Sequence, residues 1–301
     1  TELIGRLLEG KGEIPLFTSC CPAWVDYAEK NCHDLLPHVS SAKSPQQMMG
    51  AMIKTYWAEK AKLDPAKIFS VSVMPCTAKK YECKRDESMN SSGFQDVDSV
   101  LTTRELARFI KQAGIDFNSL AESEADNPLG PYTGAGTIFG ATGGVMEAAL
   151  RTAYAVITGS ELGDINFVPA RGLQDVKEAT VNVKGKDLRI AVVHQLGNVA
   201  AVVDAVRASK AKGGEPLYHF IEVMACRGGC VSGGGQPYGA DDEVRAKRAT
   251  GLYTDDTKSE IRVSHKNPYV QQVYTEYLGK PNSEKAHHLL HTHYVQRPLY
   301  K

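Results

Sequence analysis

Five of the seven cysteines in this 301-residue chain lie in three short segments that are far apart in the sequence. Cys20 and Cys21 form an adjacent pair, Cys76 stands alone, and Cys226 and Cys230 are four residues apart. Each segment follows a short apolar run that is typical of a buried strand. Because thiolates are soft metal ligands, this pattern predicts one metal centre assembled from distant parts of the chain.

The spacing of these cysteines argues against two other uses. Seven cysteines are too few for a disulfide scaffold of this size, and adjacent cysteines cannot easily form a relaxed bridge. Compact zinc sites use two close cysteine pairs, whereas only Cys226 and Cys230 form a pair of that kind here. Gly228 and Gly229 between them would let the backbone pass closely over a bulky group. The sequence therefore favours an iron-sulfur cluster over zinc.

Apolar periodicity predicts strands that alternate with helices. We expect strands at 14–17, 68–73 and 217–223, and a hairpin of 179–183 with 188–193. Helices are expected at 3–8, 22–27, 45–62, 102–112, 145–157 and 199–211, with a polar loop at 122–136 and a polar, helical tail from 241 that is clearest at 270–278. This order predicts an α/β fold whose sheets are flanked by helices, with the metal centre at the carboxyl ends of strands.

The composition bounds the classes of function. Lys plus Arg and Asp plus Glu are 35 each, so no net charge favours nucleic acid or an anionic membrane surface. No apolar stretch approaches the roughly 18 residues of a membrane span, and no signal peptide opens the chain. A hydrophobic fraction of 42% allows a sizeable core, so we expect a soluble globular protein. The chain opens inside a helical pattern without an initiator Met, which suggests a piece of a longer protein.

The three cysteine segments together resemble the signature motifs of iron-only (FeFe) hydrogenases. The matching segments are 18–22 (TSCCP), 74–82 (MPCTAKKYE) and 222–237 (EVMACRGGCVSGGGQP), in the family's order and spacing. The similarity continues through 40–47 (SSAKSPQQ) and 139–151 (FGATGGVMEAALR) and covers nearly the whole chain. The resemblance implies an H-cluster catalytic domain over 1–240, with the cluster between two lobes and the first lobe truncated at its start. A C-terminal helical segment over 241–301 would pack on it.

The resemblance assigns different roles to the cysteines. It implies that four of them bind a 4Fe-4S cubane, namely Cys21, Cys76, Cys226 and Cys230. Cys230 would also bridge to a di-iron subsite that carries carbonyl, cyanide and a bridging azadithiolate. Cys20 would be the proton donor to the amine of that bridge, and an ordinary pKa of about 8.5 suits a thiol to this role. Without the other motifs, Cys20 would be interpreted as a buried apolar thiol.

Further residues are assigned to the di-iron group by the same resemblance. Lys79 would donate to a cyanide, whereas the neighbouring Lys80 is expected to be solvated. The groups expected to contact or pack the cofactor are Ser44, Gln46, Met224, Phe139 and Pro75. Taken alone, Met224 and Phe139 would be ordinary core residues.

A proton route is also implied. Ser40, Glu2 and Arg6 match the family's serine, outer glutamate and surface arginine. The family's inner glutamate would fall just before Thr1, together with the rest of the first lobe. We therefore expect either an upstream part of the same protein or a second chain.

Two classes of function remain open. The leading hypothesis is an enzyme that reversibly reduces protons to dihydrogen, and the alternative is a non-catalytic iron-sulfur protein, either an assembly factor or a hydrogen sensor. The enzyme would need maturation proteins and an electron partner such as ferredoxin or a nicotinamide-dependent redox subunit. We expect the cytoplasm of an anaerobic bacterium, with the periplasm as the other compartment.

Some signals lie outside this assignment. Arg227 either raises the cluster potential or points to the surface without effect. Four histidines near the end, at 287, 288, 291 and 293, fit a solvated polar face better than a zinc site. The glycines at 134–140 resemble a dinucleotide loop only faintly. Cys32 and Cys83 are expected to be ordinary thiols, and His194 has no evident carboxylate partner.

Overall fold

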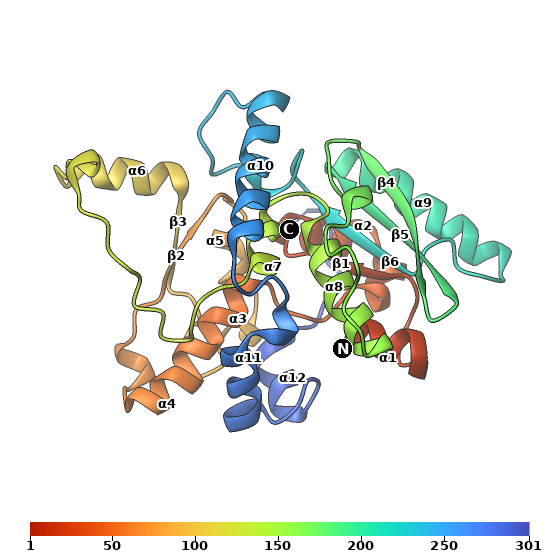
Figure 1. The fold of residues 1–301 in the computed structure, drawn as a ribbon, viewed down its shortest axis with the longest axis horizontal. Coiled ribbons are helices and arrows are strands. Elements are labelled where there is room, and N and C mark those ends of the chain that lie inside the picture. Colours follow the sequence, from red (N-terminus) through yellow and green to blue (C-terminus); the bar gives the residue numbers. More distant parts are fainter. Residues whose placement is uncertain (301) are drawn as a thin grey trace.

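The computed structural model describes residues 1–300 and contains two separate β-sheets (Figure 1). The larger sheet has the strand order β1-β6-β5-β4, and the smaller sheet pairs β2 with β3. Strands of the larger sheet are β1 (Leu16–Thr18), β4 (Val176–Val183), β5 (Lys186–His194) and β6 (Phe220–Met224). The smaller sheet consists of β2 (Val71–Met74) and β3 (Ser99–Thr102). With helices on these sheets, the predicted α/β class is confirmed.

Strand direction brings two cysteine-bearing turns to one edge of the larger sheet. Both β1 and β5 run parallel to β6, while β4 and β5 form the predicted antiparallel hairpin. Thr18 at the end of β1 is paired with Glu222 in β6. Because β1 and β6 are neighbouring parallel strands, the turns that hold Cys20 and Cys226 leave the sheet side by side.

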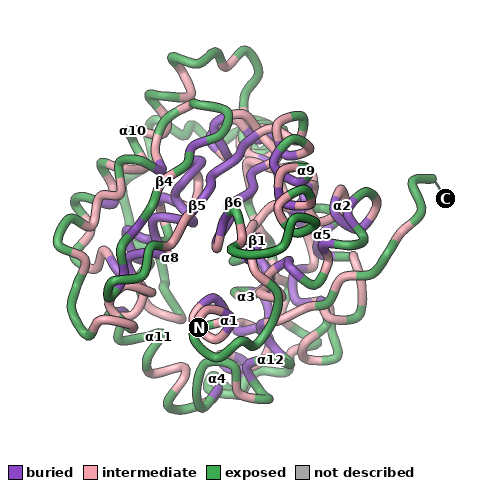
Figure 2. The backbone as a smooth tube through the Cα atoms, turned by 90° about the vertical axis from the view of Figure 1, so that its right-hand side faces the viewer, coloured by how far each residue is buried: buried purple, intermediate pink, exposed green. Residues whose placement is uncertain are grey.

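Helices cover both faces of the larger sheet, as parallel strands require. On one face, α2 (Pro22–Asn31) and α9 (Leu196–Lys212) share a core with β1, β5 and β6. On the other face, α1 (Glu2–Glu9) and α8 (Gly144–Thr158) share a second core with the same strands. Side chains of a strand alternate between these cores, so β6 and the second half of β5 are buried, as Figure 2 shows in purple, whereas residues of β4 alternate between buried and exposed or half-buried.

Shorter helices surround the smaller sheet. The predicted helix at 45–62 is observed as α3 (Pro45–Met52) and α4 (Ala58–Ala61), joined without interruption by a π turn over Ile53–Trp57. The other helices here are α5 (Lys79–Glu82), α6 (Thr103–Gln112) and α7 (Gly134–Thr137). Thr102 and Glu105 form a capping box at the start of α6, which confirms the predicted helix start.

The structure corrects the expected elements in two places. Strand β3 was not predicted, because its four residues precede the helix start at Thr102 too closely to show a period of their own. The predicted loop at 122–136 ends in the short helix α7, which begins where the Thr133 side chain accepts a hydrogen bond from the Gly136 amide at 3.2 Å.

The C-terminal part is helical, as predicted. It contains α10 (Asp242–Lys258), α11 (Pro268–Val273), a π turn over Tyr274–Leu278 and α12 (Glu284–Leu290). The segment at 270–278 is helical as expected, but the longest helix of this part is α10.

A buried ion network joins α10 to α8. The Arg151 guanidinium in α8 donates to Asp256 in α10 at 2.9 Å and to Glu147 at 2.7 Å, and all three side chains are fully buried. Arg262 donates a further hydrogen bond to Asp256 at 2.6 Å. Buried charges are tolerated only when they are paired in this way, so the network fixes the C-terminal helices on the larger sheet.

The smaller sheet is less well covered. Val71 and Val73 on one face of β2, and Phe69 two residues before the strand, are 52%, 47% and 71% exposed. The amphipathic helix α6 buries none of its residues fully, and its Phe109 is 60% exposed. Parallel strands are normally covered on both faces, so this apolar surface has the character of an interface.

Within residues 1–300, none of the helices combines the length and apolar composition that crossing a bilayer requires.

We predict that Asp256→Asn lowers the free energy of unfolding by about 3 kcal/mol, because it removes the buried carboxylate that Arg151 and Arg262 share and leaves Arg151 paired with Glu147. The matched control is Glu243→Gln, which breaks the exposed pair with Lys247 on the same helix. That control should cost about 0.5 kcal/mol or less. Denaturant unfolding of both variants measures the difference, and equal losses would show that the network does not hold α10.

Candidate metal centre

All five cysteines of the three segments follow strands directly. Cys20 and Cys21 come after β1, Cys226 and Cys230 after β6, and Cys76 after β2 of the smaller sheet. Ser19 joins the first two turns, because its hydroxyl donates to the Val223 carbonyl at 2.6 Å and accepts from the Cys21 amide at 3.0 Å. The fold therefore brings the turns of both sheets together.

The motif thiols influence one another's pKa. A hydrogen bond between the thiols of Cys20 and Cys230 lowers the pKa of Cys20 and raises that of Cys230. Burial raises the pKa of Cys21 to about 11, with a further contribution from Cys20 and Cys76. Burial and the nearby Cys76 also raise the pKa of Cys226. Such buried sulfurs become thiolates when a metal binds them.

Three glycines let the cysteine-bearing loops approach closely. A Cβ atom on Gly229 would lie 2.7 Å from the Thr142 amide nitrogen, and one on Gly235 would lie 2.9 Å from the Cys76 amide nitrogen. A Cβ on Gly233 would collide with the Pro75 carbonyl oxygen. The same loops are joined by the Gly235 amide, which donates to the Pro75 carbonyl at 2.9 Å. Pro75 therefore positions the loops through its backbone.

The donor set fits an iron-sulfur cluster. Within residues 1–300, no three cysteine, histidine or carboxylate side chains converge on a point where they could share one metal ion. Each cysteine of a cubane binds a different iron, so its four sulfurs stand apart around the cluster. The motif cysteines lie on loops that pack closely at glycines, and this agrees with four cysteines placed around one cubane.

Lys79 and Glu82 form a buried ion pair beside Cys20. The Lys79 ammonium donates to the Cys20 carbonyl at 2.8 Å and to the two Glu82 oxygens at 2.9 and 3.1 Å. Burial is the largest single effect and lowers the pKa of Lys79, but the Glu82 carboxylate together with the Cys20 and Cys230 thiols outweighs it, so the pKa is raised. The ammonium is therefore held charged, and all three of its hydrogens are directed.

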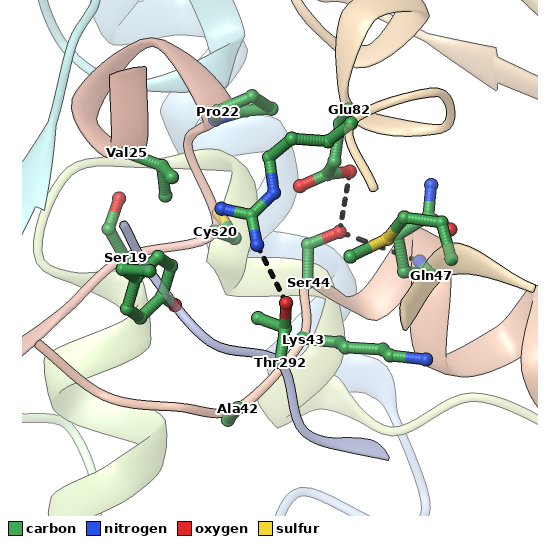
Figure 3. A pocket seen from close by; sticks show the side chains of 13 residues that line it. Ser19, Cys20, Pro22, Val25, Ala42, Lys43, Ser44, Gln47, Glu82 and Thr292 are labelled. Carbon is green, nitrogen blue, oxygen red and sulfur yellow. Dashed lines mark hydrogen bonds between the residues drawn. The ribbon is translucent and has the colours of Figure 1, made fainter. Parts of the chain in front are cut away.

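Glu82 also binds two other residues of the predicted site. The Ser44 hydroxyl donates to it at 2.8 Å and the Gln46 amide at 3.3 Å. Figure 3 shows the Ser44 hydroxyl between Glu82 and Gln47, whose backbone it caps at the start of α3. No role was predicted for Glu82 from the sequence, although it lies in the second cysteine motif, three residues after Lys79 on the same turn of helix.

A small polar pocket adjoins Cys20 (Figure 3). Its volume is about 20 Å³, which is room for about one water molecule. Gln47 lines it, is fully buried, and has no protein partner for either polar atom of its side-chain amide among residues 1–300. Gln47 was not predicted, and a bound water would satisfy it.

Within residues 1–300, hydrogen bonds join three residues of the predicted proton route, Ser40, Glu2 and Arg6, but do not reach Cys20. The Ser40 hydroxyl donates to Glu2 at 2.6 Å, and Arg6 donates to the same carboxylate at 2.7 Å. Arg6 differs from the expected surface arginine, because its side chain is buried and also donates to the carbonyls of Glu13 and Pro37 at 2.7 and 3.1 Å. Among residues 1–300, no hydrogen bond links Cys20 to Ser40 directly.

The two apolar residues of the prediction differ in their surroundings. Met224 ends β6 and is fully buried immediately before the turn that holds Cys226. Phe139 is half-buried and packs with Ile138 and Tyr253. The carbonyl of the next residue, Gly140, would lie 3.1 Å from a Cβ on Gly229, so this segment borders the cysteine loop.

Two buried polar groups to which sequence analysis assigned no role support the loop after β6. Glu222 is fully buried, and its oxygens accept from the amides of Gly143 and Met146 at 2.6 Å, at the start of α8. Burial raises its pKa. His194 accepts the Gly228 amide at Nδ1, 3.1 Å away, and its Nε2 contacts the Gln174 carbonyl at 3.0 Å. Burial lowers its pKa, so the ring is neutral and takes a backbone partner.

Arg227 points away from the cysteines. Its guanidinium donates twice to Asp242 at the start of α10, at 2.8 and 2.6 Å, and once to Asp175 at 3.2 Å. Of the two interpretations left open by the sequence, the outward orientation is observed, and it joins the cysteine loop to the C-terminal helices.

The remaining candidates stay apart from the centre. Cys32 lies in the core beneath α2, and Cys83 is buried in a small cluster by β3, as expected of ordinary thiols. The rings of His287 and His291 stack with centroids 4.1 Å apart, and no third ligand joins them among residues 1–300.

Comparison with known proteins places the chain among hydrogenases. Residues 1–234 match the family described as iron only hydrogenase large subunit, C-terminal domain, and residues 242–297 match iron hydrogenase small subunit. An NADP-reducing hydrogenase subunit of Solidesulfovibrio fructosivorans is 49% identical over 297 residues, which is 98% of this chain and 50% of that protein. The chain thus spans about half the length of that relative.

A solved structure and a second kind of relative extend this result. Apo [FeFe]-hydrogenase HydA1 from Chlamydomonas reinhardtii, variant C377H, superposes with a TM-score of 0.83 at 40% identity, covering 99% of this chain and 80% of that one. Cytosolic iron-sulfur assembly component 3 of Rattus norvegicus is 36% identical over 292 residues, 93% of this chain and 59% of that protein. The matched profile and these identities show that the chain belongs to the iron-only hydrogenase family, whose members carry an iron-sulfur centre.

Proposed function

We propose that this chain forms the catalytic centre of an FeFe hydrogenase, which reversibly combines two protons and two electrons into dihydrogen. The observation that carries the proposal is the group around Cys20: a half-buried thiol whose backbone carbonyl accepts a hydrogen bond from Lys79, a buried lysine paired with Glu82. A cluster that only stores or transfers electrons needs its ligands but no such proton-bearing and cationic groups.

The proposed ligands are the four cysteines other than Cys20. Cys21, Cys76, Cys226 and Cys230 would hold a 4Fe-4S cubane, and Cys230 would also bridge to a di-iron group with carbonyl, cyanide and azadithiolate ligands. When bound, this H-cluster supplies the electrons and the site at which hydrogen forms. The close loop packing at Gly229, Gly233 and Gly235 supports this ligand set.

The residues of the chain would move protons and orient the cofactor. Cys20 would hold a proton at Sγ, and its mutual influence with Cys230 on pKa supports a position near the proposed bridging ligand. Lys79 would turn one of its hydrogens to an anionic ligand of the di-iron group, with Glu82 keeping it charged. Ser44 and Gln46 would hold Glu82 in place, and Met224 and Phe139 would exclude water.

Ser40, Glu2 and Arg6 would form the outer part of the proton route. Their hydrogen bonds of 2.6 and 2.7 Å support this role. The step from Cys20 to Ser40 would require a further group or water. We infer that the inner glutamate suggested by the family resemblance supplies it from a segment that precedes Thr1 in a longer protein or belongs to a second chain.

The exposed face of β2 supports a further partner. The three exposed apolar residues on or just before β2 and the uncovered helix α6 offer an interface for additional protein, in the same chain or another. The electron partner is proposed to be ferredoxin or a nicotinamide-dependent redox subunit, and cofactor insertion would need maturation proteins. The cytoplasm of an anaerobic bacterium remains the predicted compartment.

A cluster-assembly protein is the second candidate, because an assembly component is 36% identical over most of this chain. The two functions are separated by loading the complete protein with a synthetic di-iron precursor and measuring dihydrogen evolution from reduced methyl viologen. Turnover supports the hydrogenase. Stable cubane binding without any turnover would refute it and favour the assembly role.

We predict that Cys20→Ser leaves the clusters assembled but lowers turnover by about 10²–10⁴-fold, because a hydroxyl is a far weaker acid than a thiol. Iron content and the infrared bands of the carbonyl and cyanide ligands verify assembly. Cys83→Ser is the control, since Cys83 is a buried thiol in a small cluster by β3 that donates to the Lys80 carbonyl at 3.3 Å. Turnover equal to that of the control would contradict the relay role of Cys20.

We predict that Cys230→Ser prevents stable retention of the di-iron group, because a serine oxygen is a poor substitute for a bridging thiolate. The measurement is the infrared intensity of carbonyl and cyanide ligands per chain after loading and gel filtration. The control is again Cys83→Ser, which should retain the group. Full retention in Cys230→Ser would rule out the bridging assignment.

A further inference from the structure

The last residues of the C-terminal part run alongside the segment that carries Ser40. Residues 290–294, which we call the strap, pair with residues 40–43 in antiparallel fashion, with Ala42 opposite His291. The Lys43 amide donates to the Leu290 carbonyl at 2.9 Å, and the Thr292 amide donates to the Ser41 carbonyl at 2.8 Å. The strap lies within the region that matches the small-subunit profile.

Two side chains of the strap contact the serines themselves. The Tyr294 hydroxyl donates to the Ser40 carbonyl at 2.6 Å, and the Ser41 hydroxyl lies 2.8 Å from Nδ1 of His291. The Ser40 amide donates to the Phe17 carbonyl at 2.8 Å, so both peptide groups of Ser40 are fixed. Both side chains that contact Ser40 and Ser41, His291 and Tyr294, therefore belong to the strap.

The same two serines hold Glu2. The Ser40 hydroxyl donates to one carboxylate oxygen at 2.6 Å, and the Ser41 amide reaches the other at 3.4 Å. Ser41 therefore contacts Glu2 through its backbone amide and His291 through its hydroxyl, so it links these two residues. A loss of the strap contacts would free the segment to turn away from Glu2.

The strap is itself firmly anchored. Arg85 donates to the Thr292 hydroxyl at 2.6 Å and to the His293 carbonyl at 2.7 Å, and its guanidinium lies 5.2 Å from the centre of the Tyr294 ring. Figure 3 shows Thr292 at the border of the pocket beside Cys20. Arg85 therefore restricts the movement of the strap, because a buried arginine with several hydrogen-bond acceptors has little conformational freedom.

We propose that the strap is part of the proton-relay site, and that His291 and Tyr294 are positioning residues that hold Ser40 and Ser41 against Glu2. The proposal rests on the proposed hydrogenase function for its activity measurement, but not for its structural measurement. It gives the small-subunit-like region a role in the proton route beyond packing.

Three variants and one control test the proposal. Tyr294→Phe removes only the hydroxyl, and His291→Ala removes the ring. His291→Asn keeps a polar atom close to the position of Nδ1 and should restore the contact with Ser41. His287→Ala is the control, because the His287 ring packs against His291 and, among residues 1–300, its side chain forms no hydrogen bond with residues 40–43.

The first readout is amide hydrogen exchange of residues 40–43 in the protein without the cofactor. The second is the kcat and KM for dihydrogen evolution with methyl viologen in the loaded protein. For Tyr294→Phe and His291→Ala we expect exchange to be faster and kcat lower by roughly fivefold each, the equivalent of one hydrogen bond of about 1 kcal/mol, with KM unchanged. His291→Asn should reverse both changes, and the control should show neither.

Unchanged exchange in both Tyr294→Phe and His291→Ala would overturn the positioning role. Faster exchange with unchanged kcat would overturn the link to the proton route, as would an equal effect of His287→Ala. If the unaltered protein shows no turnover, the proposed function fails, and the exchange rates then decide the positioning claim alone.

Discussion

The site depends on close backbone contact between the loop after β6 and two other loops. Gly229 lies against Thr142, Gly233 against Pro75, and Gly235 against Cys76, each too close for a Cβ atom. Cys226 and Cys230 belong to the loop after β6, and Cys76 belongs to the loop after β2. The contact between these loops therefore sets the distance between thiols that follow strands of different sheets. A side chain at any of the three glycines would push the loops apart.

Buried carboxylates also hold the elements around the site together. Glu82 holds Lys79 and accepts from Ser44, Glu222 binds the amides that open α8, and Asp256 pairs with Arg151. Each carboxylate has partners from a different element, so each joins segments that apolar packing alone would leave free to slide. The metal centre is thus built on a rigid polar framework as well as on two apolar cores.

The sequence predicted the parts of the fold that have a clear period or a clear stop signal. The hairpin of β4 and β5, the helices α8 and α9, and the capped start of α6 follow from local patterns. Strand β3 was missed because it is short and runs directly into α6, and the second sheet was missed with it. The cysteines proposed as ligands were identified from their motifs, whereas Glu82, His194 and Tyr294 contact partners far away in the sequence. Contacts between residues so far apart in the sequence cannot be predicted from the spacing of residues within a local motif.

The central claim is that Cys20 stands outside the cubane while the other four motif cysteines bind it. Reconstitution with iron and sulfide alone, followed by electron paramagnetic resonance of the reduced protein and iron counting, tests it without the di-iron group. We expect about four irons per chain and a reduced-cluster signal in Cys20→Ala, and loss of both in Cys76→Ala. Loss of the cluster in Cys20→Ala, or its full retention in Cys76→Ala, would contradict the assignment.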